Sequence, residues 1–184
     1  MTTSLFSTVK GSERGYEPDE VDTFFAQARA LYEGREGRSL TSTQIQTSTF
    51  ELVRGGYDTH EVDEALDRLE GAFIARQRAA YVAAHGQQAW LDALAERART
   101  LYDRLGRPEG QKFRPAERGE PAYDTDDVDD LCDRLVDFFD RQVPLTSTEV
   151  RDTVFRRRRG TAGYAEGPVD AFLARAVEVL LGVE

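Results

Sequence analysis

Few residues of this chain combine a reactive side chain with the neighbours that chemistry needs. The single cysteine, Cys132, has no histidine near it in the sequence, which favours a small core side chain over a reactive thiolate. His60 and His85 each lack a second ligand at metal-binding spacing, and we expect both at the surface. No nucleophile elbow, phosphate loop or paired-carboxylate pocket can be recognised. The sequence therefore predicts a non-catalytic protein without a cofactor.

An acidic cluster is the main candidate for a metal site. Within seven residues lie five aspartates whose carboxylates could hold a divalent cation: Asp124, Asp126, Asp127, Asp129 and Asp130. The cluster lacks the Asp-x-Asp-x-Asp-Gly spacing and the distal glutamate of a calcium loop. A helix start accounts for most of it, because acidic side chains stabilise the positive first turn of a helix. We therefore predict no metal site.

The run Arg156, Arg157, Arg158, Arg159 is a basic exception in a chain whose formal net charge is −10. That balance argues against a nucleic-acid partner, because binding to nucleic acid depends on neutralising phosphates. Near an anionic bilayer each arginine would gain roughly 1 kcal/mol, an attraction that acts against the charge of the whole body. Peripheral membrane contact and a plain solvated loop both stay open for this segment.

Length and composition indicate a globular protein. Of the 184 residues 40% are hydrophobic, enough to bury a core in one domain or in two small ones. No window approaches the roughly 18–20 consecutive apolar residues of a membrane span. The first residues lack the basic start and apolar middle of a secretion signal. We therefore expect a cytoplasmic location.

The elements that carry these residues are set by an internal duplication. At a shift of 107 residues, Phe6 aligns with Phe113 and Tyr16 with Tyr123. The segment LTSTQIQTSTF, from Leu40, recurs as LTSTEVRDTVF at a shift of 105. Each half again contains two related units, because GYEPDEVDTFF resembles GYDTHEVDEAL. The four units are anchored at Tyr16, Tyr57, Tyr123 and Tyr164.

Each anchor tyrosine precedes a predicted helix start. Asp58 with Glu61 and Asp124 with Asp127 are capping pairs, and Pro18 suits a first helical position. The fourth unit has AEGP in place of an acidic cap, so we expect its helix start to be looser or displaced.

Two capping boxes lie upstream, TSTQ from Thr41 and TSTE from Thr146, and each is predicted to open a short helix. An Arg/Gly-rich loop then leads to the anchor tyrosine and the longer helix. Each half is therefore predicted to contain a module of short helix, loop and longer helix, preceded by a truncated unit that keeps the loop and longer helix.

The longer helices carry an apolar seam for helix pairing. Behind each anchor the apolar residues recur with steps of 4, 3 and 4. The pattern lasts about two heptads, short of the three or four that indicate an extended coiled coil. The seam residues are Val62, Leu66, Leu69, Phe73, Val128, Cys132, Leu135, Phe139, Val169 and Leu173.

Between the halves, residues 87–105 predict an additional helix whose Trp90, Leu94, Leu101 and Leu105 are available for burial. The predicted fold is all-α, with tandem units packed as helix pairs without an extended coiled coil. The predicted domains are a first pair at 1–85 (units 6–34 and 40–77), a connecting helix and linker at 86–112, and a second pair at 113–184 (units 113–141 and 145–181).

The segment from Leu40 to Asp67 contains Leu-Thr-Ser-x-x-Ile, then Phe, then Arg-Gly-Gly-Tyr-Asp-x-x-Glu-Val-Asp-x-x-Leu-Asp. This motif closely resembles the N-terminal domain of the DivIVA family of bacterial cell-division and polar-growth scaffolds. The second half matches from Leu145 to Leu173, and the other two units carry degraded versions. The tandem arrangement is similar to the DivIVA domain repeat proteins of actinobacteria. The resemblance covers most of the chain outside residues 78–112.

In that family the domain dimerises through a short parallel coiled coil. The loop before Gly-Tyr exposes an apolar side chain flanked by arginine, which touches negatively curved, anionic membrane. The resemblance therefore implies candidate membrane or partner loops at Leu52, Val53 and Arg54 and at Arg156, Arg157, Arg158 and Arg159.

The same resemblance implies an interaction or adaptor protein of cell division, polar growth or cell-wall organisation. Its partners would be unidentified proteins of that machinery, met at the inner face of the membrane at septum or poles. Two alternatives stay open: a peripheral module that binds anionic membrane through the basic loops, and a small regulatory ligand-binding protein or enzyme. We expect a monomer with internal pairing or a homodimer, and no nucleic-acid partner.

Overall fold

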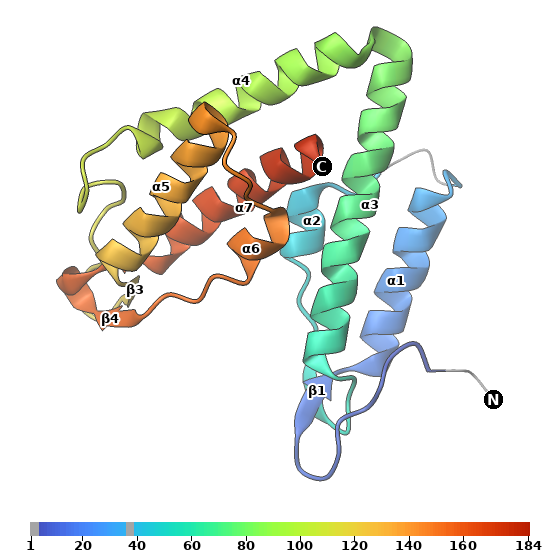
Figure 1. Ribbon diagram of the computed structural model, residues 1–184. Coiled ribbons are helices and arrows are strands. Elements are labelled where there is room, and N and C mark those ends of the chain that lie inside the picture. Colours follow the sequence, from blue (N-terminus) through green and yellow to red (C-terminus); the bar gives the residue numbers. More distant parts are fainter. Residues whose placement is uncertain (1–3, 36–38) are drawn as a thin grey trace. The chain divides into compact units, whose positions relative to one another are not determined.

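The computed structural model describes residues 4–35 and 39–184 (Figure 1). The chain is 61% helical, and seven helices and two small sheets lie in this part of it. The predicted helical class is confirmed, whereas the sheets were not predicted. Two compact units can be distinguished, Met1–Gln77 (unit 1) and Arg78–Glu184 (unit 2), and the boundary falls within one helix. Residues 1–3 of the predicted first pair, and residues 36–38 between its two units, lie outside the described part.

Unit 1 contains two longer helices, each preceded by a short extended segment. In chain order its elements are β1 (Arg14–Tyr16), α1 (Pro18–Tyr32), α2 (Ser42–Gln46), β2 (Leu52–Arg54) and the first part of α3 (Thr59–His85). The two strands pair antiparallel, with Arg14 opposite Arg54 and Tyr16 opposite Leu52. On the other side of β1, Tyr57 forms an isolated antiparallel bridge with Tyr16.

Unit 2 repeats this order behind one additional helix. Its elements are α4 (Gln87–Leu105), β3 (Pro121–Tyr123), α5 (Thr125–Arg141), α6 (Ser147–Arg151), β4 (Arg157–Arg159), the 3-10 turn η1 (Gly160–Ala162), β5 (Tyr164–Ala165) and α7 (Glu166–Val183). The strand order is β4-β3-β5, and both neighbours of β3 are antiparallel to it. The bridge at Tyr57 in unit 1 corresponds to β5 here.

The capping boxes that open the short helices are confirmed. The Thr41 hydroxyl accepts from the Gln44 N–H, and the Gln44 side chain accepts from the Thr41 N–H. Thr146 and Glu149 make the same two bonds at α6. Each box satisfies two backbone donors that a helix start leaves without partners, so five-residue helices form where the sequence predicts them.

The longer helices all begin two residues after an anchor tyrosine, at Pro18, Thr59, Thr125 and Glu166. Asp58 and Asp124 cap α3 and α5 through their carboxylates, as predicted. At α7 no side-chain cap is present, but its start is not displaced, so that part of the prediction was wrong. The backbone fixes this start instead, because the Ala165 N–H donates to the Arg114 carbonyl at 3.1 Å.

The segments predicted as Arg/Gly-rich loops are partly strands, β2 and β4. Three-residue strands are too short to show the alternating pattern that identifies a strand in a sequence. They form because each lies beside an earlier strand of its own unit, β1 for β2 and β3 for β4, whose backbone groups need partners.

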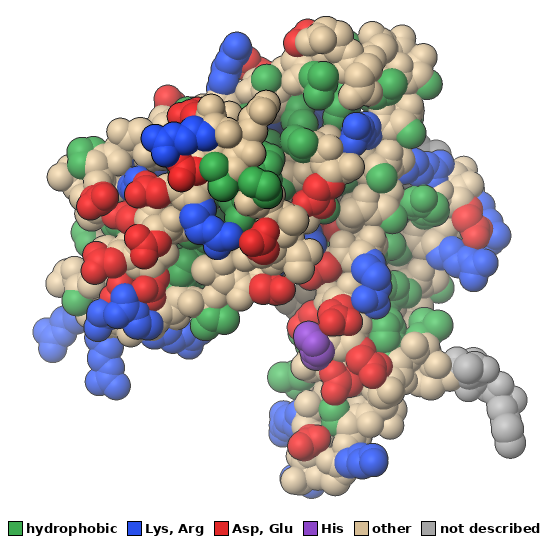
Figure 2. All heavy atoms as spheres, in the orientation of Figure 1, with side chains coloured by type: hydrophobic (Ala, Val, Ile, Leu, Met, Phe, Trp, Pro, Cys, Tyr) green, Lys and Arg blue, Asp and Glu red, His purple; other side chains and the backbone are tan. Residues whose placement is uncertain are grey.

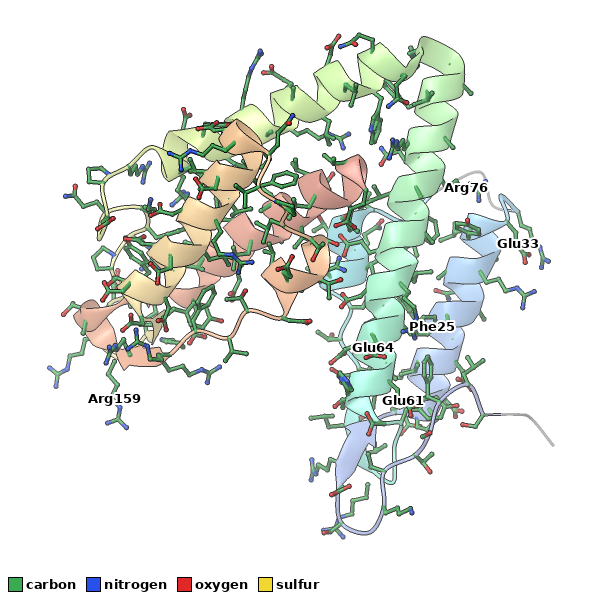
Figure 3. All side chains as sticks on the ribbon, in the orientation of Figure 1. Phe25, Glu33, Glu61, Glu64, Arg76 and Arg159 are labelled. Atoms are coloured by element: carbon green, nitrogen blue, oxygen red, sulfur yellow. The ribbon has the colours of Figure 1, made fainter. Side chains whose placement is uncertain are left out.

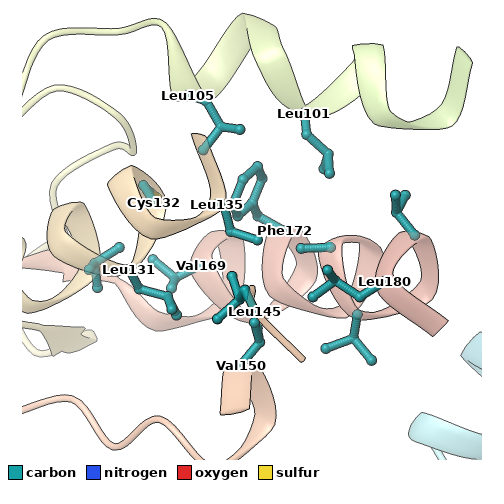
Figure 4. Packing of buried hydrophobic residues seen from close by; sticks show 14 of the residues in the cluster. Leu101, Leu105, Leu131, Cys132, Leu135, Leu145, Val150, Val169, Phe172 and Leu180 are labelled. Carbon is teal, nitrogen blue, oxygen red and sulfur yellow. The ribbon is translucent and has the colours of Figure 1, made fainter. Parts of the chain in front are cut away.

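The helix predicted at 87–105 is α4, and its four candidate core residues are buried. Leu94, Leu101 and Leu105 join side chains of α5, α6 and α7 in the core of unit 2, part of which Figure 4 shows at close range. Unit 1 has a smaller aromatic cluster around Val21, Tyr57 and Val62. Within the described residues, no helix is both long enough and apolar enough to cross a membrane.

Candidate functional site

Each unit of the structure contains two of the four sequence repeats, anchored at Tyr16 and Tyr57 in unit 1 and at Tyr123 and Tyr164 in unit 2. Each anchor tyrosine binds an aspartate of the other repeat in its unit. The Tyr57 hydroxyl donates to the Asp22 carboxylate at 3.0 and 3.2 Å. The Tyr16 hydroxyl is hydrogen-bonded to Asp63, which completes a reciprocal pair. Each tyrosine therefore reaches from its own repeat to the helix of its neighbour.

Unit 2 has the same reciprocal arrangement. The Tyr164 hydroxyl donates to Asp129 at 3.0 and 3.1 Å, and Tyr123 is hydrogen-bonded to Asp170. All four aspartates follow an anchor tyrosine by six residues. The sequence shows this Tyr-x5-Asp spacing four times, yet it does not reveal that each tyrosine binds the aspartate of the other repeat.

Aromatic contacts cross between repeats at the same places. Phe6 packs against Tyr57 and Phe50 against Tyr16, with ring centroids 5.4 and 5.3 Å apart. In unit 2, the pairs Phe113–Tyr164 and Phe155–Tyr123 are separated by 5.3 and 5.1 Å. We call the four tyrosines with their aspartate and phenylalanine partners the tyrosine lock. Its contacts relate the two repeats of each unit by an approximate twofold symmetry.

At the lock the backbone segments of the two repeats cross so closely that no side chain fits between them. In unit 1 the Tyr16 N–H donates to the Tyr57 carbonyl at 3.0 Å, and the Tyr57 N–H donates back at 2.8 Å. A Cβ atom on Gly15 would collide with the Tyr57 carbonyl, and one on Gly56 with the Gly15 carbonyl. Glycine before the tyrosine is therefore a packing requirement.

Burial and the nearby carboxylates suppress ionisation of the lock tyrosines. For Tyr164, burial together with the hydrogen bond and charge of Asp129 raises the pKa to about 12. For Tyr123, burial and then the charges of Asp170 and Glu166 raise the pKa to about 12. Neutral phenols are hydrogen-bond donors, so these side chains stay in the form that the lock requires.

The structure places the predicted seam residues inside the units. Val62, Phe73, Val128, Cys132, Leu135 and Val169 are buried, and Leu66, Leu69, Phe139 and Leu173 are half-buried. Those from α5 and α7 belong to one core cluster, whereas Val62 and Leu66 belong to the cluster of unit 1. Burial raises the pKa of the Cys132 thiol to about 12, so it stays protonated as a core side chain.

The predicted loop of unit 1 forms part of a basic tip. Leu52 is 47% exposed, Val53 is half-buried, and Arg54 is exposed opposite Arg14. Lys10 is exposed in the connection that precedes β1. Within the part of the chain that the structure describes, these three cations make no side-chain hydrogen bond or ion pair. Arg14 and Lys10 were not identified from the sequence, because the strand register that brings Arg14 to Arg54 has no local signal.

The arginine run of unit 2 is not a uniform set of solvated cations. Arg156 binds Asp127, with Nη2–Oδ1 at 2.6 Å, and Asp124 at 3.1 Å. Arg158 also pairs with Asp124. Two of the four arginines are thereby neutralised at the start of α5.

Arg157 and Arg159 remain accessible at the same end of the unit. Arg157 lies 3.6 Å from Glu166 and its side chain is 79% exposed. Arg159 points outward and has no side-chain partner among residues 4–35 and 39–184 (Figure 3). Figure 2 shows Lys and Arg side chains gathered where β3 and β4 lie, with carboxylates above them in this view.

These ion pairs involve two of the five aspartates in the acidic cluster, Asp124 and Asp127. Burial alone would raise the pKa of Asp124, but hydrogen bonds from Arg158 and from the Asp127 N–H, with the nearby arginine charges, lower it. Hydrogen bonds from the Arg156 side chain and N–H lower the pKa of Asp127. Asp129 belongs to the lock. In the described residues, no three His, Cys, Asp or Glu side chains are grouped so that they could hold a metal ion.

Compared with protein-family models, with curated proteins and with solved structures, the chain gives no match. The geometry of the lock, of the basic tip of unit 1 and of the exposed Arg157 and Arg159 of unit 2 is therefore the basis on which a function can be proposed.

Proposed function

We propose that this chain is a non-catalytic interaction protein made of two DivIVA-like pairs, in which one molecule supplies both members of each pair. The observation that carries the proposal is the reciprocal lock, with Tyr57 bound to Asp22 and Tyr164 bound to Asp129. Contacts that a family of dimers makes between molecules would here be made within one. The resemblance of Leu40–Asp67 and Leu145–Leu173 to that family supports this interpretation.

Internal pairing leaves the tips and outer helix faces free for partners, as an adaptor requires. We place the protein in cell division, polar growth or cell-wall organisation, at the inner face of the membrane at septum or poles. This cellular assignment rests on the motif resemblance.

Two measurements test the proposal. Sedimentation equilibrium should give a folded monomer at micromolar concentration, and an obligate dimer with an unfolded protomer would contradict internal pairing. A fluorescently tagged chain, expressed in its native cell, should form septal or polar foci. Diffuse signal throughout the cell cycle would contradict the division role.

Peripheral binding to anionic membrane is a second candidate, favoured by the tip of unit 1. There the half-exposed Leu52 lies next to unpaired Arg14 and Arg54, so an apolar side chain and free cations are exposed together at one surface. The net charge of −10 opposes this binding except where the tip projects beyond the acidic body.

Co-sedimentation with vesicles of anionic and of neutral lipid tests this candidate. Binding should require anionic lipid, fall with salt, and be lost in R14A/R54A. The control R29A/R68A removes the same charge from helices α1 and α3, and should bind like the unmodified chain. Equal loss in both variants would assign the effect to net charge, and the tip would have no special role.

A further inference from the structure

The outer edge of the sheet in unit 2 is an unpaired strand. In the order β4-β3-β5, β4 is bonded to β3 on one side only. The Asp124 N–H donates to the Arg156 carbonyl at 2.8 Å, so these residues form a hydrogen-bonded pair, as do Ala122 and Arg158 two residues further on. The residues between such pairs direct their amides outward. The N–H groups of Arg157 and Arg159 therefore face away from β3.

The side chains along this edge differ in how firmly carboxylates hold them. Arg158, on one face of the strand, pairs with Asp124. Arg157 and Arg159 lie on the other face and are exposed, with Glu166 only at 3.6 Å from Arg157. Residues two apart in a strand are separated by roughly 6.6 Å, so these two guanidinium groups have the spacing of alternate side chains in a neighbouring strand. Arg118, also exposed, lies near this edge, because its Cα is 3.9 Å from a Cβ built on Gly160.

We propose that β4 binds an extended, acidic segment of a partner protein as an additional strand. The partner's backbone would bond to the outward amides of Arg157 and Arg159, and carboxylates at alternate positions would pair with their guanidinium groups. This proposal deepens the interaction role proposed above by naming the chemistry of a partner. The peptide experiment below can fail while the oligomeric state and localisation still support that role.

The same arginines disfavour pairing between β4 and the β4 strand of a second copy of this chain. Pairing two such edges would bring six arginines together, because β4 is arginine at each of its three positions. Charged edge strands commonly prevent pairing between identical sheets. Here the charge leaves the edge open to an acidic strand while closing it to a basic one.

Unit 1 provides an internal comparison. Its equivalent edge, β2, has Glu17 bonded to Glu51 in the same way, so Leu52 and Arg54 direct their amides outward. One of the two exposed positions is therefore leucine instead of arginine. An acidic strand should accordingly prefer β4 to β2.

The test uses the full chain and a fluorescein-labelled Glu-Val-Glu-Val-Glu-Val peptide, followed by fluorescence anisotropy. We expect R157E/R159E to weaken binding at least tenfold, because both charge partners are reversed. The control R99E/R141E makes the same change in net charge on α4 and α5, and should leave binding within about twofold. Far-UV circular dichroism checks that both variants keep their helices. Equal weakening in the two variants would overturn the proposal.

Backbone pairing is tested separately with two methylated peptides. In a strand the amides of alternate residues face the same edge, so one peptide is N-methylated at its valines and the other at its glutamates. Only one pattern should abolish binding, and the amide protons of Arg157 and Arg159 should exchange more slowly in the complex with the unmodified peptide. Equal binding of both methylated peptides, or unchanged exchange at both arginines, would show attraction by charge alone and would overturn strand addition.

Discussion

The hydroxyl group of Tyr164 donates a hydrogen bond to the carboxylate of Asp129, and the two side chains come from different repeats of unit 2. The same hydroxyl accepts from the backbone N–H of Lys112 at 3.0 Å. Tyr164 is 1% exposed, so water cannot replace a lost partner. In unit 1 the equivalent hydroxyl of Tyr57 binds only Asp22 among the described residues.

We therefore expect Y164F to cost more stability than Y57F. Both changes remove a hydrogen bond to a carboxylate, worth about 1.5–3 kcal/mol. Removing the Tyr164 hydroxyl also leaves the buried Lys112 N–H without a partner, at about 1–3 kcal/mol more. Urea unfolding followed by Trp90, the single tryptophan and a buried residue of unit 2, measures the first change. Circular dichroism measures both. A Y164F transition equal to that of the unmodified chain would contradict the role of the hydroxyl as a bridge.

Alkaline pH should weaken unit 2 before the tyrosines ionise in the folded state. An unfolded tyrosine has a pKa of about 10, whereas Tyr123 and Tyr164 have pKa values raised to about 12. Between these values the folded state binds more protons, so the free energy of unfolding falls as pH rises. This contribution is complete below pH 10. Urea unfolding at pH 9, 10 and 11, followed by far-UV circular dichroism, should show the loss, and Y123F/Y164F should reduce its slope.

Replacing the glycine before an anchor tyrosine with alanine should lower the stability of the protein where the two backbone segments cross. A Cβ on Gly163 would meet the Tyr123 carbonyl, and backbone there is held by the sheet, so G163A should cost on the order of 3 kcal/mol. Gly167 is the control, because a Cβ there meets nothing within 4 Å and the residue lies in α7. G167A should raise stability by about 0.5–1 kcal/mol. Thermal unfolding compares the two, and similar values would argue against a crossing constraint.

Local physics made part of this fold predictable from sequence. The capping boxes at Thr41 and Thr146 act over four residues, and α4 shows its apolar spacing within one helix. Such signals lie within a few residues of each other, so a reader of the sequence can recognise them. The starts of α2 and α6 and the additional helix α4 were therefore predicted.

The lock and the ion pairs were not predictable in this way. Tyr57 and Asp22 are 35 residues apart, and Arg156 and Asp127 are 29 apart. Their contacts depend on the crossing of two repeats and on strand register, which no local pattern specifies. The arginine run illustrates the consequence: the sequence shows four cations, and only the fold shows that two of them neutralise a helix start.

Acid should weaken unit 2 through the same helix start. The Arg156 side chain and N–H donate to the Asp127 carboxylate and lower its pKa below the usual value of about 3.9. A carboxyl with a lowered pKa binds fewer protons when folded, so its contribution is present above pH 4 and is lost as pH falls through the folded-state pKa.

D127N should therefore be less stable than the unmodified chain at pH 7 and show a shallower loss of stability between pH 4 and pH 2. D130N is the matched control, because Asp130 is exposed on the same helix and has no hydrogen-bond or ion-pair partner in the described part of the chain. Urea unfolding monitored by Trp90 at pH 2.5, 4 and 7 distinguishes the two variants. If D130N and D127N lost the same stability at pH 7, general acidity of α5, and not the Arg156–Asp127 contact, would govern the acid response.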